Sequence, residues 1–140
     1  MTDEIQVKLT IVSDVLSAKD VSDLLGIEAD SSQVLGEMNR LGTKTYSHHV
    51  WMLKNRHQIN NGEIGDQIEA CVSEFLDRVS PASQSIRSLS MQIPVEVGLY
   101  VFAREVPPIS FTKSQVEALA ALGASVDIDV VLYADEQSQV

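Results

Sequence analysis

Two aspartates near the end of the chain have a spacing that suits acid–base or metal chemistry. Asp127 and Asp129 alternate with Val126, Ile128 and Val130, which is typical of a β-strand. Their carboxylates are then expected on one face, roughly 7 Å apart. Such a pair can bind a divalent ion or move protons. Because any strand face in water shows the same pattern, we predict no catalytic residue, and a metal-assisted hydrolase or transferase using this pair stays an alternative.

The histidines and the single cysteine are weaker candidates. His48 and His49 are neighbours in a predicted strand and therefore point to opposite faces, so they cannot both hold one ion. We interpret them and His57 as surface and edge histidines, and we predict neither a metal site nor a cofactor. Cys71 lies in an apolar helical stripe, which favours a buried structural thiol over a nucleophile.

A second group of residues suits the binding of an anion. Residues 38–57 contain Arg40, Lys44, Lys54 and Arg56 and no acid. This segment is +4, and since the chain as a whole is −10, the remainder carries −14. A phosphate or an acidic peptide could dock there. We favour instead a basic segment that packs on the acidic body, and no glycine-rich phosphate motif supports a nucleotide site.

Four stretches alternate apolar and polar residues as half-buried strands do. They are residues 5–11, 46–53, 95–102 and 126–133. Trp51 lies in the second of them and is expected to anchor the core. The only long irregular stretch is expected at residues 27–45, and residues 135–140 are expected to fray.

Three helices are expected to begin at a capping box with a hydrophobic staple. The boxes are Ser17 with Asp20, Asn60 with Glu63, and Thr112 with Gln115. Gly26 and Gly123 stand where the first and last of these helices need a left-handed end. A shorter helix is predicted from Ser80-Pro81.

These elements predict an α+β two-layer sandwich: a mostly antiparallel sheet of about four strands with helices packed on one face. The 140 residues, 44% of them apolar, suit a single domain over residues 1–140. Strands that alternate strictly have one apolar face for the helices. The other face must therefore meet water, a ligand or a partner.

The order of several short motifs resembles that of a known family. They are the helix from Ser17 to Ile27 that ends Leu-Leu-Gly-Ile, Gly36-Glu37, Trp51, and the closing segment from Phe111 to Asp129. In these features the chain resembles the bacterial domain of unknown function 4279 family over nearly its whole length. It departs from the family at residues 28–30, where relatives usually have a proline. The resemblance implies a small cytoplasmic bacterial α/β protein without an established activity, and an immunity-type role because some relatives occur near toxin systems.

One predicted sheet face interleaves aromatic and acidic side chains. Its candidate binding residues are Lys8, Glu96, Tyr100, Phe102, Asp127, Asp129 and Tyr133. Aromatic anchors within a polar rim are typical of binding surfaces. The acidic balance favours a basic protein partner and disfavours nucleic acid or an anionic membrane.

These observations predict a non-enzymatic binding module that uses its open sheet face. No apolar run reaches the length of a membrane span, and the first residues lack a signal-peptide pattern, so we expect a cytoplasmic protein. Besides the enzyme using Asp127 and Asp129, a second alternative is a homodimer in which the sheet face is purely structural.

Overall fold

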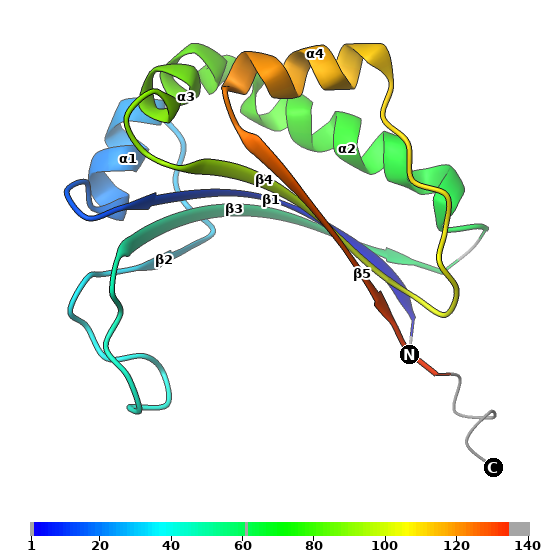
Figure 1. Ribbon diagram of the computed structural model, residues 1–140, viewed down its shortest axis with the longest axis horizontal. Helices are drawn as coiled ribbons and strands as arrows, with labels where there is room; N and C mark the ends of the chain where they lie inside the picture. Colours follow the sequence, from blue (N-terminus) through cyan, green and yellow to red (C-terminus); the bar gives the residue numbers. More distant parts are fainter. Residues whose placement is uncertain (1, 61, 135–140) are drawn as a thin grey trace.

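One sheet carries a layer of helices on one of its faces (Figure 1). The computed structural model describes residues 2–60 and 62–134. Its elements are, in chain order, β1 (Asp3–Ser13), α1 (Ala18–Leu25), β2 (Ser31–Gln33), β3 (His49–Ile59), α2 (Gly65–Val79), the 3₁₀ turn η1 (Ser80–Ala82), α3 (Ser83–Ser90), β4 (Val95–Ala103), α4 (Lys113–Leu122) and β5 (Ser125–Leu132). The predicted tail at residues 135–140 lies outside the described residues.

The sheet is mixed, with the strand order β2-β3-β1-β4-β5. All pairs are antiparallel except β4 with β5, which run parallel because α4 carries the chain back to the starting end of β4. The α+β class is thus confirmed, whereas the prediction of about four mostly antiparallel strands misses β2 and the parallel pair. β2 is short, polar and exposed, so no alternation marks it within residues 27–45.

β3 begins and ends later than the 46–53 predicted for it. It pairs with β1 from Ser13 opposite His49 to Asp3 opposite Ile59. Residues 54–58 are all polar, so the apolar half of the pattern disappears although the strand continues. The extension matters because it places Lys54 and Arg56, two basic residues of the segment 38–57, on the sheet.

Trp51 anchors the core between the sheet and the helices, as predicted. Its side chain is 1% exposed and its Nε1–H donates to Ser22 Oγ at 3.0 Å. The predicted burial of Cys71 is also confirmed, and burial, followed by the nearby Glu74 charge, raises the pKa of its thiol. Such a thiol is a poor nucleophile.

Two of the three predicted capping boxes form. Ser17 and Thr112 each accept the backbone N–H three residues on, and Gly26 and Gly123 end their helices in the left-handed conformation. The third box is wrong: α2 begins at Gly65, without a side-chain cap. Gly62 lies at φ +84°, which turns the chain between the two expected capping residues and prevents a helical first turn there.

The short helix predicted from Ser80-Pro81 appears as η1, with the proline in its first turn, and continues directly into α3.

No helix among residues 2–60 and 62–134 is long and apolar enough to cross a membrane.

Candidate functional site

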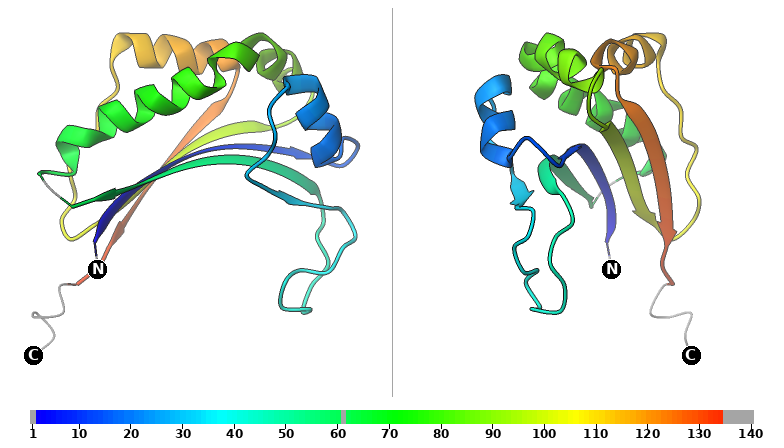
Figure 2. Two further views of the ribbon diagram at one scale, coloured as in Figure 1. Left: turned by 180° about the vertical axis from the view of Figure 1, so that it is seen from behind. Right: turned by 60° about the vertical axis from the view of Figure 1, so that its left-hand side comes forward.

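The face of the sheet that carries no helices is the candidate site. The strands bend along their length, and this open face lies on the inner side of the bend (Figures 1 and 2). The excursion at residues 34–48, between β2 and β3, extends beyond one end of the sheet on the same side (Figure 2). Alternate residues of each strand point to this face.

Register brings the predicted acidic and aromatic residues together on β4 and β5. Gly98 lies beside Asp127, and Tyr100 lies beside Asp129. Glu96 precedes them on β4, and both aspartates are exposed. The two carboxylates therefore share a face with an aromatic ring, which forms an acidic half of the open face.

The Tyr100 ring lies across the backbone of Gly98. A Cβ added at Gly98 would stand 2.5 Å from Tyr100 Cε2, so only glycine leaves room for the ring in this position. The Lys8 ammonium, from the strand on the other side of Gly98, lies 4.5 Å from the ring centroid in a cation–π contact. Burial, followed by the charges of Glu96, Asp127 and Asp129, raises the pKa of Tyr100.

Phe102 lies on the same face beside Val131 and is half-buried. Six of the seven predicted binding residues thus come from adjacent strands of one face. The seventh, Tyr133, lies beyond the end of β5: its hydroxyl donates to the carboxylate of Asp3, and its ring lies 5.9 Å from the Arg104 guanidinium carbon. Tyr133 therefore belongs to the end of the sheet and not to the group around Tyr100.

A basic half covers β1 and β3 on the same face. Lys54 lies directly opposite Lys8, and burial together with the Lys54 charge lowers the pKa of Lys8. Arg56 lies two residues further along β3. The other two basic candidates, Arg40 and Lys44, are exposed in the 34–48 excursion. The face therefore has opposite charges on its two halves, a division that follows from the strand order.

Glu4, which the sequence analysis did not single out, forms an ion pair with the basic half of this face. It is 9% exposed, accepts a hydrogen bond from Gln6 Nε2 at 2.6 Å and pairs with the Arg56 guanidinium. Burial alone raises the pKa of Glu4, but these hydrogen bonds and the Arg56 charge outweigh it, so the pKa lies below its usual value. Arg56, one residue of the basic segment 38–57, thus packs against the Glu4 carboxylate of β1.

Replacing Arg56 by methionine is expected to lower the free energy of unfolding at pH 7 by about 1–2 kcal/mol, because it leaves the buried Glu4 carboxylate with one hydrogen-bond donor fewer. A carboxyl with a lowered folded-state pKa stabilises the fold above its unfolded-state pKa of about 4.3, and the effect is lost as the pH falls through the folded-state value. The difference between the two proteins is therefore expected to narrow below about pH 4. Urea unfolding at pH 7 and pH 3 measures it.

Arg40→Met is the matched control, because Arg40 is exposed in the 34–48 excursion. It is expected to change stability by less than about 0.5 kcal/mol. An equal loss from both variants, or a loss from Arg56→Met that persists at pH 3, would contradict the role of the Glu4–Arg56 pair.

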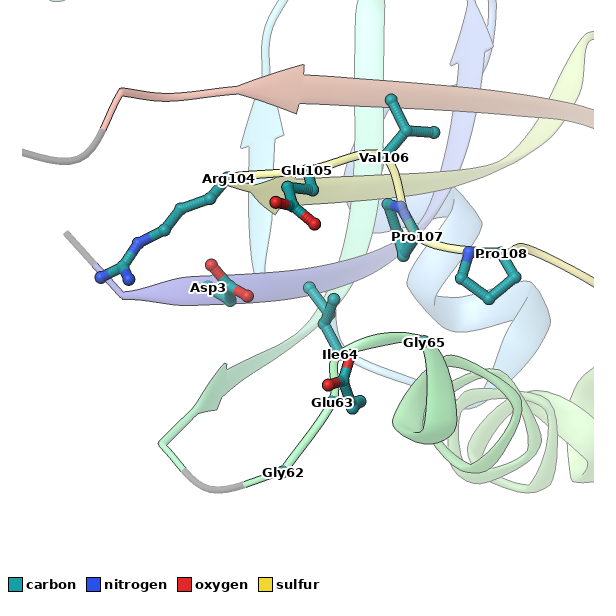
Figure 3. Close-up of a pocket in the computed structure, with 10 residues that line it drawn as sticks. All are labelled: Asp3, Gly62, Glu63, Ile64, Gly65, Arg104, Glu105, Val106, Pro107 and Pro108. Carbon is teal, nitrogen blue, oxygen red and sulfur yellow. The ribbon is translucent and has the colours of Figure 1, made fainter. Parts of the chain in front are cut away.

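A polar cavity of about 440 Å³ lies at the end of the sheet, where sequence reasoning placed nothing. Asp3 lies between the loop that carries Arg104 and the loop that carries Glu63 (Figure 3). None of the predicted site residues lines this cavity. Its lining residues are Asp3, Gly62, Glu63, Ile64, Gly65 and residues 104–108. Gly62 and Pro107-Pro108, which favour turns, are the features of the sequence that could have indicated this cavity.

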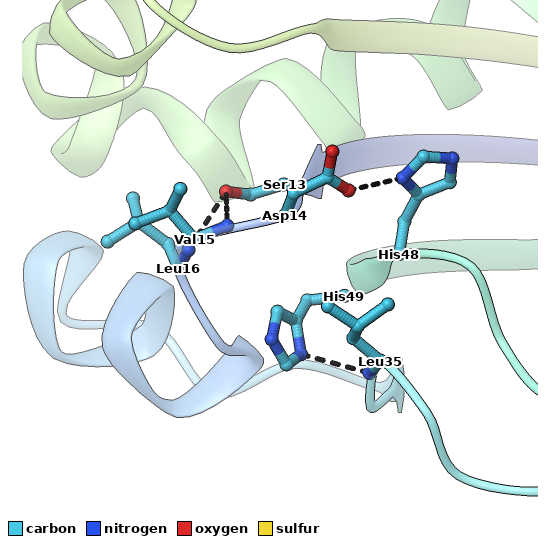
Figure 4. Close-up of polar contacts among 7 residues, drawn as sticks. All are labelled: Ser13, Asp14, Val15, Leu16, Leu35, His48 and His49. Carbon is cyan, nitrogen blue, oxygen red and sulfur yellow. Dashed lines mark hydrogen bonds and ion pairs between the residues drawn. The ribbon is translucent and has the colours of Figure 1, made fainter.

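The histidines do not converge. His48 Nδ1 lies 2.5 Å from Asp14 Oδ1, whereas His49 Nδ1 accepts the Leu35 N–H at 3.1 Å (Figure 4). His57 Nε2 lies 3.7 Å from a Glu74 carboxylate oxygen, on the helix side of the sheet. Within residues 2–60 and 62–134, no three His, Cys, Asp or Glu side chains are grouped closely enough to hold a metal ion.

Comparison with known proteins gives one finding. A family model described as "Domain of unknown function (DUF4279)" matches residues 3–133. Neither the curated proteins nor the solved structures contain a match to the chain.

Proposed function

Since the chain belongs to the DUF4279 family, a domain of unknown function, we propose its role from its own surface: it is a non-enzymatic binding module that acts through the open face of the sheet. The partner we propose is a basic protein. An immunity-type role toward a basic toxin or enzyme in the cytoplasm fits this proposal, which includes no nucleic-acid or membrane partner.

The observation that carries the proposal is the acidic half with its aromatic rings. The Tyr100 ring lies against Gly98 with the Lys8 ammonium 4.5 Å from its centroid, and Asp127 and Asp129 lie exposed beside it on β5. Aromatic rings with exposed carboxylates beside them suit lysine and arginine side chains, whose stems pack beside the rings while their charges meet the acids.

The basic half supports the same role in another way. Lys8 and Lys54 repel cationic side chains, whereas the Arg56 charge is paired with Glu4, so a basic partner is directed to the carboxylates of β4 and β5. Opposite charges on two halves of one face favour a single orientation of the partner. The net charge of −10 also steers a cation toward the protein over long distances.

A labelled deca-lysine peptide tests the proposal. We expect it to bind the full chain at low ionic strength, and to bind more weakly as salt is added, since the attraction is electrostatic. The double variant Asp127→Asn/Asp129→Asn is expected to weaken binding at least tenfold. The double variant Asp23→Asn/Asp77→Asn, which removes the same charge from the exposed surfaces of α1 and α2, is the matched control.

Equal weakening in both double variants, or no binding of deca-lysine at all, would contradict the proposal. The two alternatives have distinct signatures. Tight binding of Mg²⁺ or Mn²⁺ that Asp127→Asn abolishes would favour the metal-assisted enzyme. A dimer in mass-measured chromatography, with the open face buried between its subunits, would favour the homodimer.

A further inference from the structure

β5 presents a long, regular edge for pairing. It is the last strand in the order β2-β3-β1-β4-β5, and in the described part of the chain only β4 pairs with it. Its register with β4 is unbroken from Ser125 to Leu132, and this stretch contains no proline. Proteins usually protect such an edge with a bulge, a proline or a cover, because its free backbone groups accept a further strand.

The side chains of β5 give this edge two chemically different sides. On the helix side, Val126, Ile128 and Leu132 remain 44%, 43% and 53% exposed, so the helices cover them incompletely. On the open side, Asp127 and Asp129 are exposed, followed by Val131, which is 46% exposed. A strand that completed this edge would therefore place apolar side chains on one side and meet two carboxylates on the other.

A second copy of the chain is a poor occupant. When two β5 strands pair antiparallel with both helix layers on the same side, residues directly opposite each other share a face. In the register that centres on Ile128, Asp127 of one copy then lies opposite Asp129 of the other. Like charges directly opposite each other destabilise a pair of strands, so charge complementarity points away from self-pairing.

We propose that β5 binds an extended segment of a partner protein by strand addition, and that this segment carries lysine or arginine at every second position with apolar residues between them. The period of two in a strand places all the basic residues on the open side, where two of them lie opposite Asp127 and Asp129. The intervening apolar residues then cover Val126, Ile128 and Leu132. The inference deepens the proposed function and rests on it, because it specifies how the basic partner is held.

The test uses the full chain and a labelled eight-residue peptide that alternates lysine and valine. A peptide with four lysines followed by four valines has the same composition and charge but cannot present the two sides. We expect the alternating peptide to bind at least tenfold more tightly. Two further alternating peptides are N-methylated at the backbone, one at every lysine and the other at every valine. Because alternate N–H groups point to the same edge of a strand, one of these peptides cannot donate hydrogen bonds to β5. We expect at least one of the two to bind at least tenfold more weakly than the unmethylated peptide.

Hydrogen exchange supplies a second measurement. The amides of residues 125–132 that point away from β4 are expected to become protected when the alternating peptide binds, and Asp127→Asn/Asp129→Asn is expected to weaken that binding at least tenfold.

The outcomes separate this inference from the proposed function. If all four peptides bind equally, and the two aspartate substitutions weaken them all, strand addition is wrong while binding through the open face stands. If neither deca-lysine nor any of the four peptides binds, the proposed function is wrong and the inference fails with it. A dimer of the free protein with protected β5 amides would overturn the inference in favour of a second copy.

Discussion

Replacing Trp51 by alanine is expected to lower the free energy of unfolding by about 3–5 kcal/mol. The indole is 1% exposed and lies opposite Ile11, in the layer between the sheet and the helices. Its removal opens a cavity that the surrounding side chains fill only in part. It also removes the hydrogen bond that the indole N–H donates to Ser22 Oγ, which links β3 to α1. Because the variant loses both the packing and the hydrogen bond, we expect a loss of stability at the upper end of this range.

Two companion variants separate these losses. Trp51→Phe keeps much of the buried volume but leaves Ser22 without its donor, and it is expected to cost about 1–3 kcal/mol. Ser22→Ala removes the acceptor and keeps the indole. Unfolding in urea is followed by circular dichroism, because Trp51 is the only tryptophan of the chain. A loss below about 1 kcal/mol from Trp51→Ala would contradict its place in the cooperative core.

The features that sequence reasoning predicted well are those that local patterns determine. A capping box needs only four consecutive residues, and those at Ser17 and Thr112 form as written. The box at Asn60 fails because Gly62, inside the same four residues, turns the chain. Alternation likewise located β1, β4 and β5, and it placed Asp127 and Asp129 on one face.

The features that were missed depend on which strands become neighbours. Lys8 and Lys54 are far apart in the sequence, and only the register between β1 and β3 places them opposite each other. For the same reason Glu4 could not be recognised as the partner of Arg56. The division of the open face into acidic and basic halves is therefore a property of the strand order, which no local pattern contains. β2 was missed for a simpler reason, since its residues are polar and exposed.

Replacing Gly123 by alanine is expected to lower the free energy of unfolding by about 2–4 kcal/mol. Gly123 ends α4 at φ +68°, a conformation that costs other residues about 1–2 kcal/mol. A Cβ there would also stand 2.1 Å from Ser90 Oγ and 3.0 Å from Ser90 Cβ. The Ser90 hydroxyl donates to Arg87 O at 2.6 Å, so moving it aside breaks a hydrogen bond in α3.

Gly26→Ala is the matched control, because Gly26 ends α1 at φ +71° with nothing within 4 Å of an added Cβ. It is expected to cost only the conformational part, about 1–2 kcal/mol. In the Ser90→Gly background, Gly123→Ala is expected to fall to the same value, since the side chain that it meets is gone. Equal losses from Gly26→Ala and Gly123→Ala in the wild-type background would show that α3 and α4 do not pack closely at this point.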